Sequence, residues 1–156
     1  MSSKENFMLR AIELSINSAK KSGGPFGCVI VKNGTIISEG SNKVTSSNDP
    51  TAHAEVVAIR EACKKLNTFK LSGCDLYTSC EPCPMCLSAI YWSHVDNIFY
   101  ANTRNDAKEI NFDDSLIYSE ISKEIKDRKI STTQMMRDKA LKAFEIWEKK
   151  IDKIEY

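Results

Sequence analysis

The sequence lacks an excess of charge of one sign. Its 156 residues include 22 lysines and arginines against 21 aspartates and glutamates, so the formal net charge is +1 at pH 7. Proteins that bind nucleic-acid backbones usually carry a basic excess on one face, because phosphates are their main contact. The balance found here argues against a nucleic-acid substrate.

Long apolar runs are also missing. Residues 1–10 contain no apolar stretch of signal-peptide length, and no later stretch is long enough to cross a bilayer. We therefore expect a cytoplasmic protein with no membrane contact. Disulfides are not maintained in the cytoplasm, so the six cysteines must have a different role. Three of them, Cys80, Cys83 and Cys86, fall within seven residues, and such a cluster indicates a chemically functional site. Scattered cysteines, in contrast, are usually core residues.

Internal repeats, low-complexity tracts and linkers are absent as well, and the length suits one domain with one core. A capping box at Ser2 and Glu5 precedes apolar residues at helical spacing, and Asn33-Gly34 is a two-residue hairpin signal. Strands are predicted at 26–31, 35–39, 75–79, 97–101 and 130–135. Further helices are predicted near 51–66, at 84–92, near 116–125 and at 140–154. Loops are predicted at 41–49 and 102–114. A hairpin followed by alternating strands and helices indicates an α/β sandwich around a mixed sheet.

Two short segments combine residue types that bind metals. His53-Ala54-Glu55 opens the second helix, and Pro82-Cys83-Pro84-Met85-Cys86 opens the third. Helix starts in an open α/β sheet lie over the carboxyl ends of the strands, where ligands usually bind. One imidazole and two thiolates form a zinc set that leaves a position for water. Because two thiolates cancel the charge of the ion, such a site benefits from a carboxylate base, and Glu55 is placed for that role.

The cysteine cluster is also compatible with three sites of a different kind. Cys80 is a candidate fourth ligand, which would make a closed, non-catalytic structural zinc module. An iron–sulfur run needs a further cysteine where this chain has Ile90, and Cys83 with Cys86 alone fits a redox pair.

The joint pattern of His-Ala-Glu and Pro-Cys-x-x-Cys resembles the cytidine deaminase-like superfamily. This resemblance implies that His53, Cys83 and Cys86 bind one zinc ion per chain, that water or hydroxide is its fourth ligand, and that Glu55 is the catalytic proton shuttle. It also implies an α/β three-layer sandwich in which a central mixed five-stranded sheet is flanked by helices. The sequence leaves open whether zinc or iron is the metal in the cell.

From end to end the chain is similar to the short bacterial guanine deaminases. The similarity is carried by Asn42 and by the segments 24–27, 47–51, 78–81, 89–92, 112–115 and 155–156. It implies hydrolysis of guanine to xanthine and ammonia in purine metabolism, with residues 1–156 as a single deaminase domain. It also implies a homodimer with exchanged C-terminal segments, in which Tyr156 of one protomer closes the substrate site of the other.

The same residues suit a purine pocket. Phe26 offers a stacking face, and the Asn42 amide, which can both donate and accept, suits the adjacent N7 and O6 edge of guanine. The backbone N–H of Ala54 is a further candidate donor, and Trp92 either lines the pocket or belongs to the core. Asp114 either accepts from the guanine amino group and helps ammonia leave, or caps the helix expected near Ser115.

Competing substrates also remain. A tRNA adenosine deaminase shares the zinc motif, but the lysines of the last helix alternate with glutamates and do not form a phosphate track. Cytosine, guanosine and other aminopurines or aminotriazines are further alternatives.

Overall fold

The first helix and hairpin form where the local sequence predicts them. The structure, a computed structural model, describes residues 2–156. Helix α1 (Ser3–Ala19) starts after Ser2, whose hydroxyl accepts from the backbone N–H of Glu5 while the Glu5 carboxylate accepts from that of Ser2. Strands β1 (Gly27–Lys32) and β2 (Thr35–Ser41) flank Asn33 and Gly34, whose φ angles of 50° and 73° suit a tight hairpin.

Two further strands, β3 (Cys74–Cys80) and β4 (Asn97–Asn102), complete a mixed sheet. The strand order is β2-β1-β3-β4. β1 pairs antiparallel with both β2 and β3, and β3 pairs parallel with β4. Helix α4 (Pro84–Trp92) makes the crossover that a parallel pair requires.

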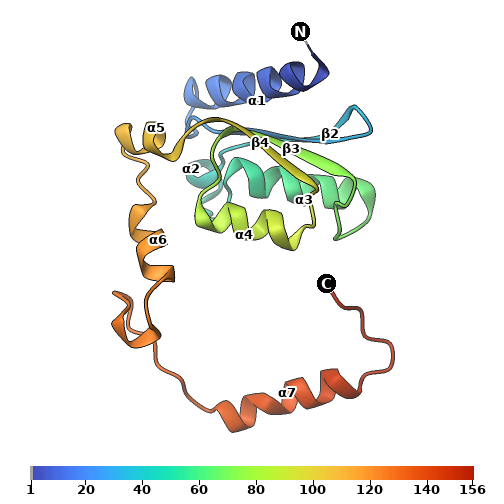
Figure 1. Cartoon of the computed structure of the whole chain (residues 1–156), viewed down its shortest axis with the longest axis vertical. Helices are drawn as coiled ribbons and strands as arrows, with labels where there is room; N and C mark the ends of the chain where they lie inside the picture. Colours follow the sequence, from blue (N-terminus) through green and yellow to red (C-terminus); the bar gives the residue numbers. More distant parts are fainter. Residues whose placement is uncertain (1) are drawn as a thin grey trace. The chain divides into compact units, whose positions relative to one another are not determined.

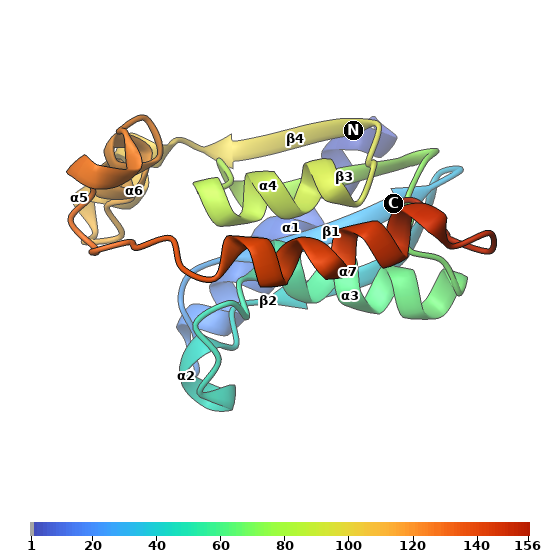
Figure 2. The same cartoon turned by 90° about the horizontal axis from the view of Figure 1, so that it is seen from below.

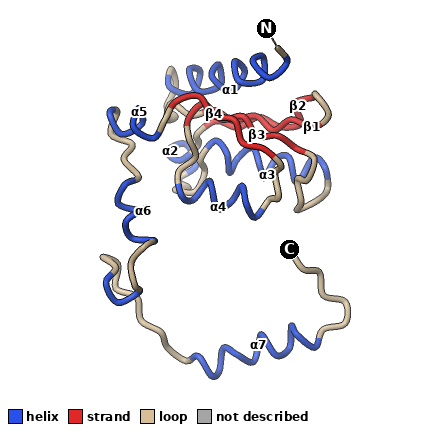
Figure 3. The backbone as a smooth tube through the Cα atoms, viewed as in Figure 1, coloured by secondary structure: helices blue, strands red, loops and turns tan. Residues whose placement is uncertain are grey.

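Helices cover both faces of this sheet (Figures 1 and 3). α1 lies on one face, while α3 (Ala54–Leu66) and α4 lie on the other, which Figure 2 shows from the α3 and α4 side. Successive strand residues alternate between the two cores, because side chains point to opposite faces of a sheet. One core contains Cys28, Ile30 and Leu76, and the other contains Val29 and Tyr77. The predicted three-layer α/β architecture is confirmed.

The prediction of a five-stranded sheet is wrong, because the sheet has four strands. Residues 130–135 form no strand, and Ile130 is 81% exposed. They belong to a separate unit, Ser115–Tyr156, whose described elements are α6 (Ser115–Ile121), a 3-10 helix η1 (Ile125–Asp127) and α7 (Arg137–Lys149). This unit contains no other strand, so the backbone of residues 130–135 has no neighbouring strand with which to form the hydrogen bonds of a sheet.

Several other elements also differ from the predictions, and the helix predicted near 116–125 ends at Ile121. The expected loop 102–114 contains α5 (Arg104–Glu109), which starts at a capping box between Thr103 and Asp106. The expected loop 41–49 contains the short α2 (Val44–Ser47). The last helix ends at Lys149, so Ile151 and Ile154 lie beyond it. No helix within residues 2–156 is long and apolar enough to cross a membrane.

Gly40 lets the start of α3 lie directly on β2. A Cβ atom at this position would clash with the carbonyl oxygen of Ala54 and would lie 2.8 Å from the backbone nitrogen of Ala58. Backbone atoms of a helix cannot move aside as a flexible side chain can, so only glycine permits this approach. The missing side chain therefore determines how close residues 53–55 come to the sheet.

We expect Gly40→Ala to push α3 away from the sheet. Overpacking of this kind typically costs about 1–3 kcal/mol, and it should also weaken zinc retention because His53 precedes α3. Urea unfolding and zinc quantification measure the two effects. Gly34→Ala is the control, since φ is +73° there but nothing lies within 4 Å of the added Cβ. The control should lose some stability and keep its zinc; equal zinc loss in both variants would contradict this account.

Candidate metal centre

The topology brings the starts of α3 and α4 to one end of the sheet. β1 runs antiparallel to β3, with Cys28 opposite Thr78, so β1 begins where β2, β3 and β4 end. His53 is the N-cap residue of α3 and Cys83 that of α4. Neither side chain makes the hydrogen bond that normally caps a helix. Both are therefore available to a ligand.

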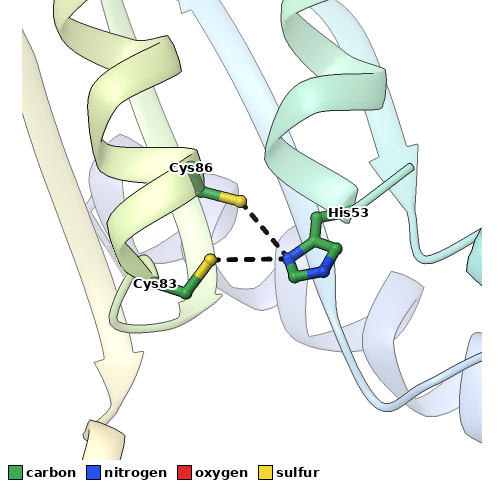
Figure 4. A group of neighbouring side chains, drawn as sticks. All are labelled: His53, Cys83 and Cys86. Carbon is green, nitrogen blue, oxygen red and sulfur yellow. Dashed lines mark hydrogen bonds between the residues drawn. The ribbon is translucent and has the colours of Figure 1, made fainter. Parts of the chain in front are cut away.

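These side chains and Cys86 converge (Figure 4). The Nδ1 atom of His53 lies 3.6 Å from Sγ of Cys83 and 3.4 Å from Sγ of Cys86. The three ligand atoms all lie within 4.8 Å of one another, and Cys86 is fully buried. The arrangement brings together the three residues predicted as zinc ligands.

The spacing of these atoms fits a tetrahedral zinc ion. Zinc binds histidine nitrogen at about 2.0–2.1 Å and thiolate sulfur at about 2.3 Å, which places N and S about 3.6 Å apart at a tetrahedral angle. The two N···S distances, 3.6 and 3.4 Å, agree with that value. The donor set and its geometry therefore suit zinc bound through Nδ1 of His53.

Proximity also sets the acidity of the two thiols. The hydrogen bond from Cys86 and the contact with His53 lower the pKa of Cys83 to about 4. The hydrogen bond to Cys83 and burial raise the pKa of Cys86. The first proton is thus lost easily and the second is held, as for any tightly coupled pair. A divalent cation stabilises the second thiolate and so favours loss of that proton.

Cys80 does not belong to this group. Its thiol lies 3.6 Å from the carbonyl oxygen of Thr103, to which it donates, and burial raises its pKa to about 11. Within residues 2–156, the cluster of possible metal ligands contains His53, Cys83 and Cys86 and no fourth protein ligand. This geometry favours a site with an open position over a closed structural site.

Glu55 lies in the first turn of α3, and its side chain is buried, with a residue exposure of 6%. Its Oε1 atom accepts a hydrogen bond of 3.2 Å from the hydroxyl of Thr78 on β3. Burial raises the pKa of this carboxyl, and the nearby Cys83 raises it further. A carboxyl with a raised pKa beside an open metal position can both accept and return a proton near neutral pH.

Two residues predicted to bind the substrate lie side by side next to Gly24. A Cβ atom at Gly24 would lie 3.3 Å from the Phe26 ring and from the Asn42 side chain. The backbone N–H of Asn42 donates to the carbonyl of Phe26, and Asn42 Oδ1 accepts from the N–H of Val44. Phe112 packs edge-on against Phe26, with ring centroids 4.9 Å apart.

Asp114 forms an ion pair of 3.2 Å with Arg104, and its side chain is 16% exposed. Burial raises its pKa more than Arg104 lowers it, and the charge of Cys83 contributes in the same direction, so this carboxylate lies near the metal-ligand group. Glu81, two residues before Cys83, accepts from the backbone N–H of Arg104. The metal-binding loop and Asp114 are therefore linked through the start of α5.

Ala54, Trp92 and Tyr156, also predicted to bind the substrate, lie in three different environments. Ala54 is fully buried at the first position of α3. Trp92 is the last residue of α4, at the opposite end of that helix from Cys83, and is 63% exposed. The structure does not bring Trp92 to the metal ligands of its own chain. Tyr156 belongs to the C-terminal unit, and its role stays a prediction.

Sequence reasoning gave no role in this region to Thr78, Arg104 or Phe112, although Thr78 and Phe112 lie in segments that carry the similarity to guanine deaminases. The capping box of Thr103 and Asp106 was a usable signal for α5, and hence for Arg104. Nothing local identifies Thr78, because its contact with Glu55 joins a strand to a helix 23 residues away.

The comparisons with known proteins agree with this geometry. The family described as "Cytidine and deoxycytidylate deaminase zinc-binding region" matches residues 1–102. The chain belongs to this deaminase family. Its His53, Cys83 and Cys86 cluster is the possible metal site of a zinc-binding deaminase domain, as predicted.

Two relatives are similar over very different lengths. A guanine deaminase from Bacillus subtilis (strain 168) is 53% identical over 153 residues, which are 97% of this chain and 98% of the relative. The crystal structure of guanine deaminase from Bacillus subtilis matches with a TM-score of 0.95 and the same identity and coverage. A tRNA-specific adenosine deaminase from Aquifex aeolicus (strain VF5) is 44% identical, but over only 63% of this chain and 65% of the relative.

Removing ligands one at a time distinguishes the open site from the closed one. We expect Cys86→Ala to lose bound zinc, because two protein ligands hold the ion poorly. The matched change Cys80→Ala should keep one zinc per chain after dialysis, since that thiol bonds to Thr103. Zinc per chain is measured by atomic emission. Loss of zinc from the Cys80 variant, with its fold intact by circular dichroism, would make Cys80 a ligand.

Proposed function

We propose that this chain catalyses the zinc-dependent hydrolysis of guanine to xanthine and ammonia. The main support for this proposal is the buried carboxylate of Glu55, which lies next to a metal site with three protein ligands and an open position. The chain is also 53% identical, along nearly its whole length, to a guanine deaminase. A structural zinc module has no need of an acid–base carboxylate beside the metal.

His53, Cys83 and Cys86 would hold the ion, which when bound supplies the Lewis acidity that makes water a nucleophile near neutral pH. Glu55 takes a proton from the water that attacks C2 of guanine and delivers a proton to ring N3. C2 becomes tetrahedral and carries the new hydroxyl. Glu55 then takes the proton of that hydroxyl and passes it to the amino group, so that the C2 carbonyl forms, the C–N bond breaks and ammonia leaves. Water and guanine are thereby converted to xanthine and ammonia, with Glu55 regenerated.

Recognition of the base rests on Phe26, Asn42 and the start of α3. The Phe26 ring offers an apolar face for stacking, held from the side by Phe112. The bond from the N–H of Val44 to Oδ1 fixes the orientation of the Asn42 amide and leaves its NH2 group to donate to N7 or O6 of guanine, both of which are acceptors. The backbone N–H of Ala54 is one of the first in α3, which intrahelical bonding leaves unused.

Asp114 is the proposed acceptor for the guanine amino group. A carboxylate accepts but does not donate when ionised, so it favours an amino substituent over a carbonyl oxygen at the same position. The ion pair with Arg104 favours the ionised form, against the effect of burial. This arrangement selects an aminopurine and releases a product that lacks the amino group.

A homodimer with exchanged C-terminal segments is part of the proposal. None of the residues 115–156 is buried, and the apolar side chains of α7 and the following segment are exposed, including Phe144, Ile151 and Ile154. A unit without a core of its own needs a partner surface for such side chains. In this arrangement Tyr156 closes the substrate site of the partner protomer, and residues 1–156 act as one deaminase domain.

Substrate choice tests the proposal directly. We expect xanthine and ammonia from guanine, with guanosine, adenine, cytosine and an adenosine-containing tRNA stem-loop reacting much more slowly. Inosine formation in the stem-loop would instead favour the activity named for the tRNA-specific adenosine deaminase relative. Product identification by chromatography together with ammonia release separates these outcomes.

Glu55→Gln keeps the size of the side chain and removes its proton-transfer capacity. We expect it to retain one zinc per chain and to lower kcat for guanine by more than about 100-fold. Near-full turnover in this variant would end the assignment of Glu55 as the proton shuttle.

The neighbouring aspartates offer a matched pair. Asp114→Asn removes the charge of a 16% exposed side chain, whereas Asp113→Asn alters a 43% exposed one that pairs with Lys108. Hydrogen bonds to charged groups contribute about 1.5–3 kcal/mol, so kcat/KM for guanine should fall about 10- to 100-fold in the Asp114 variant. The Asp113 variant should stay near the wild type. Equal values for the two variants in steady-state kinetics would remove Asp114 from substrate binding.

A further inference from the structure

Thr78 is a buried hydroxyl that the proposed chemistry does not yet use. It lies on the central strand β3 and is 1% exposed. The register places it opposite Cys28 of β1, which is fully buried. The closeness of Glu55 contributes to raising the pKa of that Cys28 thiol. The Glu55 carboxylate therefore lies close to two central strands, with Thr78 supplying a hydroxyl there.

The hydrogen bond distinguishes the two oxygens of Glu55. Thr78 Oγ1 donates to Oε1 at 3.2 Å, and the connection joins the sheet to the first turn of α3. A carboxylate free to rotate about its last bond presents either oxygen to the substrate. The carboxylate also forms a hydrogen bond with the thiol of Cys86, so it extends from the sheet to the metal ligands. With Oε1 held by Thr78, Oε2 is the oxygen that this arrangement assigns to the proton.

We propose that Thr78 is a positioning residue, which holds Oε1 of Glu55 and thereby assigns proton transfer to Oε2. This inference rests on the proposed role of Glu55 in guanine deamination. It goes beyond that role because it explains how a single carboxylate takes a proton from water and delivers one to the base. In this proposal, the transfer from water and the transfer to the base both use Oε2. This oxygen must stay in a fixed position, because acid–base catalysis depends on hydrogen-bond geometry.

Two substitutions at Thr78 separate the hydroxyl from the packing. Thr78→Val keeps the branched shape and removes the donor, while Thr78→Ser keeps the donor and removes a buried methyl group. If Thr78 serves packing alone, the Ser variant is the worse of the two. If it positions Glu55, the Ser variant stays active and the Val variant does not.

Ser38, on strand β2, provides a control because it bonds to the same helix, α3. Its buried hydroxyl donates to the carbonyl oxygen of Ala58 at 2.7 Å, so it also ties α3 to the sheet, one turn away from Glu55. Ser38→Ala should lower the melting temperature without lowering kcat. The comparison shows whether any loss of activity comes from loosening α3 or from the bond to Glu55.

The experiment measures kcat and KM for guanine, zinc per chain and melting temperature for these variants and the wild type. We expect Thr78→Val to lose about 10- to 100-fold in kcat, as is typical when a supporting hydrogen bond is removed, with KM and zinc content unchanged. Thr78→Ser should keep kcat within about threefold of the wild type, a change of less than about 1 kcal/mol in the barrier.

Three results would overturn the inference: full kcat in Thr78→Val, a loss in Thr78→Ser equal to that in Thr78→Val, or a matching loss in Ser38→Ala. If Thr78→Val does not fold, Thr78→Cys replaces it, because a thiol is only a weak donor. We then expect Thr78→Cys to have a lower kcat than Thr78→Ser. If the wild-type protein leaves guanine unchanged, the proposed function itself is wrong. If the wild type is active and Thr78→Val is equally active, only the inference about Thr78 is wrong.

Discussion

The ligand atoms of His53, Cys83 and Cys86 lie within 4.8 Å of one another, although 30 residues separate the histidine from the first cysteine. That convergence constrains much of the N-terminal unit. α4 must follow β3 almost directly, and α3 must begin at the same end of the sheet. Gly40 permits the required closeness, since any side chain there would meet the backbone of α3. The metal site is thus a consequence of how two helices start.

Two carboxylates near this site have different surroundings and therefore different chemistry. Glu55 is buried against the sheet, where its carboxylate accepts from the hydroxyl of Thr78, and burial raises its pKa so that proton transfer becomes practicable. Asp114 is paired with Arg104, which opposes the effect of burial and favours the charged acceptor. Pairs of acidic groups with contrasting environments are how enzymes assign acid–base and binding roles to the same functional group.

The features predicted correctly from sequence are those encoded locally. A capping box predicted α1, Asn33-Gly34 predicted the hairpin, and two short motifs at helix starts predicted the metal ligands. The fifth strand at 130–135 failed because a strand depends on a partner that local sequence does not specify. Likewise, the contact between Thr78 and Glu55 depends on strand register and helix packing together, and no pattern of neighbouring residues encodes it.

The central claim is that three protein ligands hold the metal and leave one position open. Zinc-edge X-ray absorption on the purified protein tests it most directly, because it reports the ligand atoms themselves. The account predicts two sulfurs at about 2.3 Å with two lighter atoms at about 2.0–2.1 Å, one of them an imidazole nitrogen and the other oxygen. Three sulfurs and one nitrogen, with no oxygen, would contradict it and establish a closed structural site.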